Sequence, residues 1–461
     1  MALSPTRTVV SSPGKVLLCG GFLVLDRAYT GLTFGIDARI HVVVNDIPTA
    51  PGVTLSEIIV KSPQFRDAVW EYSYRQTEED GGIHLTQLRA AASQRISRNL
   101  FVEAALGYVL TYVSTIQPAR IQPASVTILA DNDYYSAPSD IPCAAGSSNP
   151  PKFADFGTPL NKTNKTGLGS SAALVTAFTA ALLVHYLPIE EFSLSNDQGK
   201  SILHNLAQAA HCAAQGKVGS GFDVASAVYG SCLYRRFSPS ILQHHGEPAS
   251  PGFAKQLKTL VEDTDPKYKW DTEIIKSAVT VPKGIRLVMC DVDCGSETPG
   301  MVKKVLAWRS ANYEDAERIW KQLQKHNEEL AAELVRLGQD QDDNYSALRE
   351  IIFKARALIR EMSQKSDVPI EPPAQTKLLD DCSNVPGVIG GVVPGAGGFD
   401  AIALLIEDRA EVLSGLRDYL QDRQADSSSS GQQVGKVNIL GVREEMEGVR
   451  IEDVSMYAQW T

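Results

Sequence analysis

The chain has 461 residues, of which 43% are hydrophobic and 21% are charged, and its formal net charge is −10 at pH 7. This composition is typical of a globular protein with two or three compact units, and the negative charge argues against broad binding to nucleic acid or anionic membranes. The sequence contains neither an apolar run long enough to span a bilayer nor a signal-like apolar segment near the N-terminus, so we expect a cytoplasmic protein.

The beginning of the chain is predicted to be rich in strands. Apolar residues flank the turn-like sequence SSPGK at 11–15, so we expect short strands at 8–10 and 16–18 on either side of it. A further strand is predicted at 36–44, where apolar residues dominate.

Helices and strands are then predicted to alternate as far as residue 237. The three-and-four spacing of apolar residues predicts a helix at 98–115, and a strand is expected at 125–130. The stretch 135–164 is rich in Pro, Ser and Asn, which predicts a lid or an insertion. After it we expect a helix at 170–187, a helix at 196–214 that ends at Gly216, a short helix at 219–230 and a strand at 231–237.

A domain boundary is predicted between residues 238 and 252, where His, Pro, Gly and Ser interrupt the apolar periodicity. We therefore expect one unit at 1–238 and another at 239–461. In the second unit, strands mixed with charged amphipathic helices predict an α+β arrangement. Its predicted elements are a strand at 285–291, helices at 301–310, 314–337 and 345–363, strands near 388 and at 401–406, a helix at 408–424, a polar loop at 425–435 and a strand at 437–442.

The cysteines are scattered and odd in number, and no two of them form a CxxC pair. We expect reduced, mostly buried thiols, which argues against a disulfide framework or a structural zinc site. The seven residues are Cys19, Cys143, Cys212, Cys232, Cys290, Cys294 and Cys382.

The stretch KTGLGSSAALVT, which begins at Lys165, places a turn of Gly and Ser directly before a long apolar helix. Gly167 and Gly169 permit backbone conformations in which successive N–H groups converge on an anion. Ser170 and Ser171 open the helix, whose first N–H groups carry the positive end of its dipole. The pattern predicts a phosphate site, and the alternative is an ordinary helix capped by Ser after a Gly turn.

Three further motifs carry groups that suit phosphate chemistry. In SSPGKVLLCGGFLVLD, Lys15 precedes a glycine pair, and the alternative for this lysine is a solvated side chain. In QGKVGSGFDVASAVYG, Asp223 opens a helix, where it is either a functional carboxylate or a cap. In VPGAGGFDAIALL, three glycines precede a strand, and a hairpin turn is the alternative.

Taken together and in this order, the four motifs resemble those of the GHMP kinases. PGKVLLCGG, GLGSSAA and VPGAGGFDAIAL match the first, second and third motifs of that family. GGFLVLD, KTGLGSSAALVT and AHCAAQGKVGSGFDVASAVYGS make the chain most similar to the eukaryotic, fungal-like phosphomevalonate kinases, over nearly its whole length. The resemblance implies two α+β lobes with ATP and substrate between them, the N-terminal lobe like domain 2 of ribosomal protein S5 and the C-terminal lobe ferredoxin-like.

The resemblance also implies roles for individual residues. Lys15 and Asp223 would be catalytic, and Ser171 would hold Mg²⁺, the expected cofactor. Arg39 and His41 could face the substrate or point outward. The expected ATP-binding residues are Lys165, Gly167, Leu168, Gly169, Ser170, Ser171, Ala172 and Asn99. The expected substrate-binding residues are Gly20, Gly21, His211, Ser220, Gly395, Ala396, Gly397 and Gly398.

The acceptor that the resemblance implies is itself a phosphate. Its second pKa is about 6, so near neutral pH it is already a nucleophile and needs little deprotonation. The main obstacle is then repulsion between two phosphates. We expect Lys15 to neutralise the approaching oxygens and Asp223 to orient Lys15 and Mg²⁺, with base catalysis secondary.

His211 departs from the pattern of the wider family. Mevalonate kinases place a Glu that binds Mg²⁺ on the helix before the GxD turn, and this chain has His211 there. Imidazole is a poor ligand for Mg²⁺, which prefers oxygen. His211 is therefore predicted to be either a phosphate donor or a histidine packed between helices.

The expected function is ATP-dependent phosphorylation of 5-phosphomevalonate, a step of the mevalonate pathway to isoprenoids and sterols. The alternatives are mevalonate kinase or another small-molecule kinase of the family, and a catalytically silent regulator with the same fold. The expected partners are ATP and 5-phosphomevalonate, without nucleic acid or membrane. The chain is expected to be a monomer or a weak homodimer.

Overall fold

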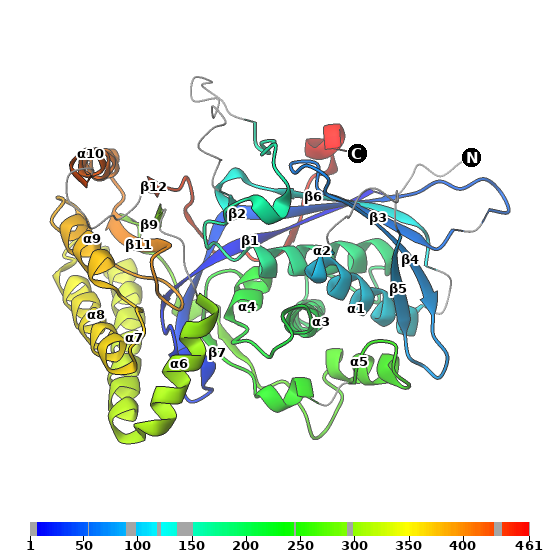
Figure 1. The fold of residues 1–461 in the computed structure, drawn as a ribbon, viewed down its shortest axis with the longest axis horizontal. Coiled ribbons are helices and arrows are strands. Elements are labelled where there is room, and N and C mark those ends of the chain that lie inside the picture. The colour runs from blue at the N-terminus through cyan, green and yellow to red at the C-terminus, as the bar shows by residue number, and fades with distance from the viewer. Residues whose placement is uncertain are drawn as a thin grey trace.

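The α+β arrangement predicted for the chain is confirmed, because strands form two sheets and helices pack on both of them. Figure 1 shows the larger sheet around β1 and β2, and the smaller sheet at the left beside α7 to α10. The computed structural model describes residues 7–53, 55–88, 98–117, 121–135, 151–243, 246–292, 298–427 and 436–460.

The larger sheet has the strand order β14-β1-β2-β6-β3-β4-β5, with β13 and β7 paired to β2, and β8 paired to β7. Only β3 and β6 run parallel among the described pairs. The strands predicted at 36–44 and 125–130 lie in β2 and β6, whereas β3, β4 and β5 were not predicted. The bounds are β1 Arg7–Cys19, β2 Thr30–Asp46, β3 Glu57–Lys61, β4 Val69–Gln76, β5 Ile83–Leu88, β6 Ala124–Ala130, β7 Cys232–Arg235, β8 Glu273–Ile275, β13 Glu444–Glu445 and β14 Arg450–Ile451.

The predicted turn at 11–15 is wrong, because β1 continues through it as one strand. Pro13 lies opposite Arg39 of β2, and the next residue, Gly14, lies opposite Ile36. Two residues of β2 therefore have no opposite residue on β1. This register shift is a β-bulge, an irregularity at which a proline can be accommodated in a sheet. Lys15 follows directly, so the bulge sets where its side chain emerges.

Helices cover one face of the larger sheet, and α2 and α4 contact β1 and β2 directly. The predicted helices at 98–115, 170–187 and 196–214 are confirmed as α1, α2 and α3. The short helix begins at Phe222 instead of 219, because Gly221 adopts a left-handed conformation and forms its N-cap. The strand predicted at 231–237 is the shorter β7, and α5 was not predicted. The bounds are α1 Leu100–Ile116, α2 Ser170–Tyr186, α3 Asp197–Gln215, α4 Phe222–Tyr229 and α5 Phe253–Val261.

The smaller sheet is antiparallel, with the order β10-β11-β9-β12. Its strands and helices follow one another as β-α-β-β-α-β, with α6 to α9 in the first helical position, which is the connectivity of ferredoxin-like folds. The strands are β9 Ile285–Val292, β10 Val388–Val392, β11 Ala401–Glu407 and β12 Val437–Ile439. The helices are α6 Thr298–Ala311, α7 Tyr313–Asp340, α8 Ser346–Ser366, α9 Pro373–Ser383 and α10 Ala410–Ser427.

The two faces of the smaller sheet have different neighbours. On β9, Val288 and Cys290 pack with Leu378 of α9 and Leu416 of α10. The alternate residue Leu287 joins the main core, which also contains the residues of the larger sheet. Since successive side chains of a strand point to opposite faces, one face is covered by α9 and α10, while the other packs in the main core, where Gly390 of β10 lies against Ile352 of α8.

The predictions for the second half of the chain are largely confirmed. The helices predicted at 301–310, 314–337 and 345–363 lie within α6, α7 and α8, while α9 was not predicted. Residues 425–427 belong to α10 and are not part of a loop, and the remainder of that predicted loop, 428–435, lies outside the described residues. The predicted strand at 437–442 ends at residue 439, where the chain turns back to the larger sheet.

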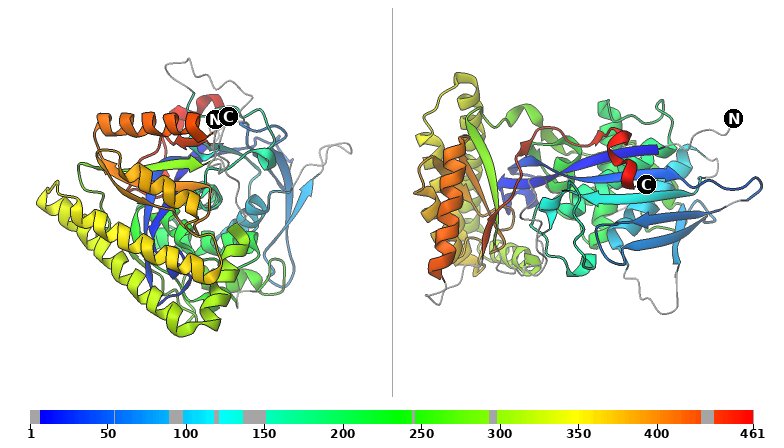
Figure 2. Two further views of the ribbon diagram at one scale, coloured as in Figure 1. Left: turned by 60° about the vertical axis from the view of Figure 1, so that its left-hand side comes forward. Right: turned by 90° about the horizontal axis from the view of Figure 1, so that it is seen from above.

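The C-terminal segment, residues 444–460, returns to the first sheet. β14 pairs with β1 (Val10 opposite Ile451), and β13 pairs with β2. In Figure 2 the red end of the chain lies along the blue strands of the beginning. α5, which follows residue 238, contacts α1 and α3, which precede it. The domain boundary at residue 238 stays a prediction.

The cysteines that the structure describes are free thiols, as predicted, and all except the half-buried Cys19 are buried; Cys143 and Cys294 lie outside the described residues. Of the predicted lid at 135–164, residues 136–150 lie outside them as well. The described part of 151–164 has one short 3₁₀ turn, Leu160–Lys162. None of the described helices has the length and apolar character needed to cross a membrane.

Candidate active site

The turn before α2 has the geometry of an anion site. Gly167 and Gly169 have φ angles of 77° and 81°, which favour glycine. Gly169 is the N-cap of α2 and provides no side-chain cap to the helix. Ser170 and Ser171 lie inside the first turn, so the alternative of a Ser-capped helix is wrong. Because Gly169 has no side chain, no N-cap group accepts a hydrogen bond from the first N–H groups of the helix, and they are directed toward the turn.

Lys15 of β1 lies against this turn. Its backbone N–H donates to the Leu168 carbonyl at 2.9 Å, and its Nζ donates to the Gly167 carbonyl at 3.1 Å. Nζ also lies 5.6 Å from the centre of the Phe222 ring. Burial lowers the pKa of the Lys15 ammonium, and the charge of Asp223 partly offsets that effect. Lys15 is half-buried, and its ammonium is held at the turn instead of extending freely into solvent.

Gly169 leaves room for the Lys15 side chain, which yields a prediction. A Cβ at Gly169 would lie 2.8 Å from Lys15 Cε. Gly169→Ala is expected to lower kcat about tenfold or more, because the lysine must move from its position. Gly52→Ala is the matched control, since Gly52 also has a φ of 81° but has no atom within 4 Å of a Cβ. Equal kcat for both variants in a steady-state assay would contradict the prediction.

Asp223 lies in the first turn of α4, and its carboxylate does not cap that helix in the usual way. The N-cap is Gly221, and Asp223 Oδ1 accepts the N–H of the next residue, Val224, at 3.0 Å. Its other oxygen, Oδ2, lies 3.9 Å from His211 Nε2. The carboxylate thus has capacity for a further partner on the side of His211 and Lys15.

His211 connects the start of α2 with the start of α4. Its side chain is 3% exposed, and Nε2 lies 3.2 Å from Ser171 Oγ. The ring packs against Phe101 of α1, and Gln215 Nε2 lies 3.4 Å from His211 Nε2. The packed-histidine interpretation is therefore correct for the ring, while Nε2 faces two residues of the predicted site.

The first and third glycine motifs meet near Leu17, two residues after Lys15 on β1. A Cβ at Gly21 would lie 2.7 Å from the Gly395 carbonyl, and the Gly395 N–H donates to the Leu17 carbonyl at 3.3 Å. Gly397 and Gly398 pack against Ile370, whose carbonyl accepts the Gly398 N–H at 2.9 Å. The motif connects the antiparallel strands β10 and β11, so the hairpin alternative is correct for its topology. The same loop brings Gly395 against Gly21 of the other half of the chain.

Other residues expected in the site have local structural roles. Asn99 caps α1, because its Oδ1 accepts the Val102 N–H at 3.3 Å. The side chains of Leu168 and Ala172 are buried in the core, so only their backbone is available to a ligand. Lys165 is exposed and pairs with Tyr135 in an isolated bridge.

Arg39 and His41 do not face a substrate. Arg39 donates to Ser11 Oγ at 2.7 Å and to the Gly448 carbonyl. His41 Nδ1 lies 2.8 Å from the Tyr457 hydroxyl. Both side chains are buried against the C-terminal segment, whose return to β1 the sequence patterns did not indicate.

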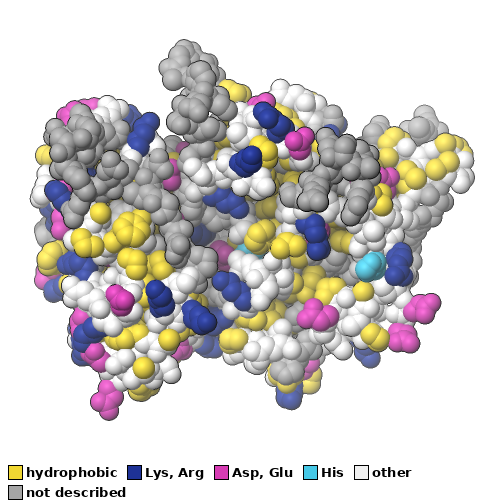
Figure 3. All heavy atoms as spheres, in the orientation of Figure 1, with side chains coloured by type: hydrophobic (Ala, Val, Ile, Leu, Met, Phe, Trp, Pro, Cys, Tyr) yellow, Lys and Arg dark blue, Asp and Glu magenta, His cyan; other side chains and the backbone are white. Residues whose placement is uncertain are grey.

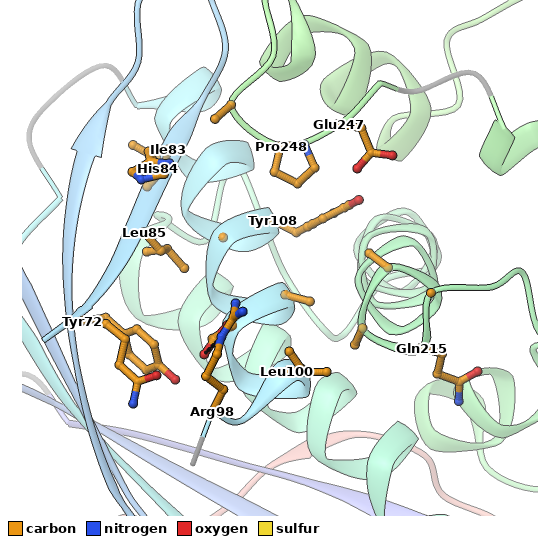
Figure 4. A pocket seen from close by; sticks show the side chains of 18 of the residues that line it. Tyr72, Ile83, His84, Leu85, Arg98, Leu100, Tyr108, Gln215, Glu247 and Pro248 are labelled. Carbon is orange, nitrogen blue, oxygen red and sulfur yellow. Dashed lines mark hydrogen bonds and ion pairs between the residues drawn. The ribbon is translucent and has the colours of Figure 1, made fainter. Parts of the chain in front are cut away.

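A cavity of about 1390 Å³ lies beside the phosphate turn, between β4, β5, α1 and the end of α3. Figure 4 shows Tyr72, Arg98 and Leu100 at one end, Glu247 and Pro248 at the other, and Tyr108 between them. Gln215 lines it too and also contacts His211, so the cavity adjoins the Ser171 end of the site. In Figure 3, Lys and Arg side chains gather around a hollow in the middle of the molecule.

Arg236 and Tyr234 are site-supporting residues that sequence reasoning missed. Tyr234 Oη donates to the Ser220 carbonyl at 2.7 Å, and Arg236 donates to the Gly219 carbonyl at 2.7 Å. The signal available was the sequence YRRF at 234–237, shortly after the motif with Asp223. Their acceptors are backbone carbonyls, which every residue has. No residue type at 218–220 therefore indicates these hydrogen bonds in the sequence.

Comparisons with known proteins agree with this geometry. The family described as "GHMP kinases N terminal domain" matches residues 154–231. The chain is 52% identical to the phosphomevalonate kinase of Gibberella zeae over 464 residues, covering 100% of both chains. It is 33% identical to the "Phosphomevalonate kinase, peroxisomal" of Arabidopsis thaliana, covering 96% of both. The structure of Streptococcus pneumoniae phosphomevalonate kinase in complex with phosphomevalonate and AMPPNP matches with a TM-score of 0.61 at 15% identity, over 95% of this chain and 99% of that one.

The match to the bacterial structure confirms the GHMP kinase fold expected from the four motifs. Two relatives above 30% identity match along nearly the whole chain. The chain therefore belongs to the phosphomevalonate kinase family of the GHMP kinases.

Proposed function

We propose that the protein transfers the γ-phosphoryl group of ATP to 5-phosphomevalonate, giving 5-diphosphomevalonate and ADP in the mevalonate pathway. The observation that carries the proposal is the convergence of Lys15, the glycine turn before α2, His211 and Asp223 at one place. The identity to the relatives over the full length supports the same substrates.

In the proposed mechanism, Gly167 to Ala172 hold the ATP phosphates through the turn and the start of α2. Lys15 contacts this turn, and Leu17, two residues later on β1, accepts the Gly395 N–H at the Gly21–Gly395 contact, where we place the acceptor phosphate. Its ammonium offsets the charge that two phosphates bring together, and phosphoryl transfer depends mostly on positioning and on such neutralisation. The Asp223 carboxylate stabilises the protonated form of Lys15 and orients its ammonium group.

The residues present fit a magnesium ion. Mg²⁺ prefers oxygen ligands and is commonly held by one or two protein groups together with substrate phosphates and water. Ser171 Oγ and Asp223 Oδ2, both neighbours of His211 Nε2, are the oxygens that would hold it. When bound, the ion supplies positive charge to the phosphate oxygens. No group of three or more His, Cys, Asp or Glu side chains in the described part of the chain forms a metal cage, which agrees with a site completed by substrate.

The cavity beside α1 is the proposed site for the nucleoside of ATP. It adjoins the phosphate turn through Gln215, and the hydroxyl of the buried Tyr72, which lines it, has no partner among the described groups. Such a hydroxyl is a suitable partner for a base or a ribose. Asn99, at the start of α1 beside Leu100, stays a predicted contact.

Filling this cavity tests the nucleoside assignment. Ala104 lies on α1 and lines the cavity, so Ala104→Trp is expected to raise KM for ATP about tenfold, the equivalent of about 1.4 kcal/mol, and to leave KM for phosphomevalonate unchanged. Ala410→Trp, on the exposed start of α10, controls for a new surface indole. An unchanged KM for ATP in a folded Ala104→Trp enzyme would place the nucleoside elsewhere.

A coupled assay of ADP release across mevalonate, 5-phosphomevalonate, homoserine and galactose tests the function itself. Turnover on 5-phosphomevalonate is expected. Turnover on mevalonate alone would make the protein a mevalonate kinase, and no turnover on any substrate would favour a silent regulator.

Two further expectations stay predictions. Sedimentation over a concentration range distinguishes a monomer from a weak homodimer.

For the location in the cell, we propose the cytoplasm, and the name of the Arabidopsis thaliana relative makes the peroxisome the alternative. Imaging of the tagged chain against markers for both compartments separates them.

A further inference from the structure

The guanidinium of Arg236 lies between two turns of the site. Arg236 directly follows β7, and its Nη1 donates to the Leu25 carbonyl at 2.6 Å. Its Nη2 donates to the carbonyls of Gly219 at 2.7 Å and Val218 at 3.1 Å. One side chain therefore connects the turn that follows Gly20 and Gly21 to the turn that precedes Asp223.

β7 holds the turn before Asp223 at three successive carbonyls. Arg236 donates hydrogen bonds to the carbonyls of Val218 and Gly219. Tyr234, two residues earlier on the same face, donates to the carbonyl of Ser220. The next residue, Gly221, has no free space around it, because a Cβ there would lie 2.7 Å from Tyr234 Oη. The backbone that leads into Asp223 is thus fixed from one side over its whole length.

The burial of Arg236 is costly and calls for an explanation. The residue is 8% exposed, and within the described residues no carboxylate lies at ion-pair distance from it. Its Nε is buried and has no partner among the described groups. Burial lowers the pKa of this guanidinium, although arginine stays protonated in proteins. The Asp26 charge acts on Arg236 only from beyond ion-pair distance. A buried charge without a close counter-charge is usually less favourable than an apolar side chain of similar size, so packing alone does not account for it.

The turn at Leu25 also contacts the other half of the chain. The next residue, Asp26, accepts from Arg309 of α6 at 2.8 Å. The 3₁₀ turn Leu23–Leu25 is thus held by Arg236 on one side and, through Asp26, by α6 on the other. Arg236 sets the distance between this turn and the one that carries Asp223.

We propose that Arg236 is a positioning residue for Asp223, which acts by holding the Val218 and Gly219 carbonyls in a fixed place relative to the Gly20–Asp26 turn. The proposal rests on the proposed role of Asp223 in the reaction. Arg236 itself does not touch the substrates in this arrangement, because both of its Nη atoms are engaged by backbone carbonyls and its Nε is enclosed.

The first test replaces the fork of donors by a single ammonium. Arg236→Lys keeps the charge but cannot reach three carbonyls in two directions. Its kcat is expected to fall about 10²-fold, the cost of a small misplacement of a reacting group, while KM for ATP stays within about twofold. The matched control is Arg235→Lys, since Arg235 lies on the outer side of the same strand end and donates to Arg27, Ala28 and Glu273. An unchanged kcat for Arg236→Lys would overturn the proposal.

A double-mutant cycle tests whether Arg236 acts through Asp223. If it does, Arg236→Lys is expected to lower kcat by less than about twofold in an Asp223→Asn background, because the carboxylate it positions is already absent. Independent, multiplicative losses would overturn the proposal. A loss seen chiefly as a higher KM for phosphomevalonate would overturn it too, since that result identifies Arg236 as a substrate contact. Full activity of Asp223→Asn, by contrast, would contradict the proposed function of Asp223.

Chemical rescue separates positioning from a general loss of structure. Arg236→Ala leaves a space beside three carbonyls, and added guanidinium at millimolar concentration is expected to restore kcat at least fivefold, on the order of 1 kcal/mol. Urea at the same concentration serves as the uncharged control. The proposal is wrong if Arg236→Ala is folded like the parent, by circular dichroism spectrum and melting curve, and its kcat is neither lowered by the substitution nor raised by added guanidinium.

Discussion

Replacing Lys15 with methionine is expected to lower kcat about 10³-fold with little change in KM for ATP, the upper range for removal of one donor to a developing charge. Lys15 Nζ donates to the Gly167 carbonyl of the phosphate turn at 3.1 Å. Methionine retains most of the apolar contact with Phe222 and Gly169 and removes only the charge. Near-native turnover in a coupled ADP assay would show that another group neutralises the two phosphates.

The pH dependence of an Asp223→Asn enzyme distinguishes two roles for the carboxylate. Burial lowers the pKa of Lys15, and the charge of Asp223 raises it again in part. If Asp223 supports the protonated lysine, its loss lowers the pKa of Lys15 further, so activity is lost at a lower pH on the alkaline side than in the parent. If Asp223 is a general base instead, the deficit shrinks as pH rises. Profiles of kcat from pH 6 to 10 for both enzymes decide between these opposite trends.

Replacing Arg39 with alanine is expected to lower the free energy of unfolding by about 3–5 kcal/mol, the usual cost of breaking a buried charged network from one side. The side chain is 2% exposed and donates to Ser11 and to the Gly448 carbonyl. Ser11 in turn donates to Glu452, so three parts of the chain would lose partners together.

Urea unfolding followed by circular dichroism measures this effect, with Arg7→Ala as the control. Arg7 lies on the neighbouring strand β1, donates to Asn45 at 2.8 Å and is only half-buried, so its loss is expected to cost less than about 1 kcal/mol. Limited proteolysis gives a second readout, because Arg39→Ala should expose residues 444–460 to cleavage. Equal stability of the two variants would show that the C-terminal segment is held by its strands alone.

The elements that could be predicted from the sequence are those whose pattern is local. The helices α1, α2 and α3 show apolar spacing or a long apolar run, and the glycine and serine turn before α2 marks its start. The pair Pro13 and Gly14 indicated a turn, yet a bulge in the partner strand accommodates the proline. That partner is remote in sequence, so no local pattern reveals it.

The same distinction holds for the site. Lys15, Ser171 and Asp223 lie in motifs that could be found in the sequence, and the structure brings Lys15 and Ser171 to the same turn. Arg236 and Arg39 were not assigned their roles, because their acceptors are largely backbone carbonyls, which every residue has. Long-range hydrogen bonds to the backbone leave no residue pattern to find.

The pairing of β14 with β1 has a consequence for synthesis of the protein. β1 acquires this neighbour only after Arg450–Ile451 has been made. Contacts between such distant segments form slowly, and domains otherwise fold in order during translation. We therefore expect this edge of the N-terminal sheet to stay uncovered in the nascent chain well after the residues of the nucleotide site have been made.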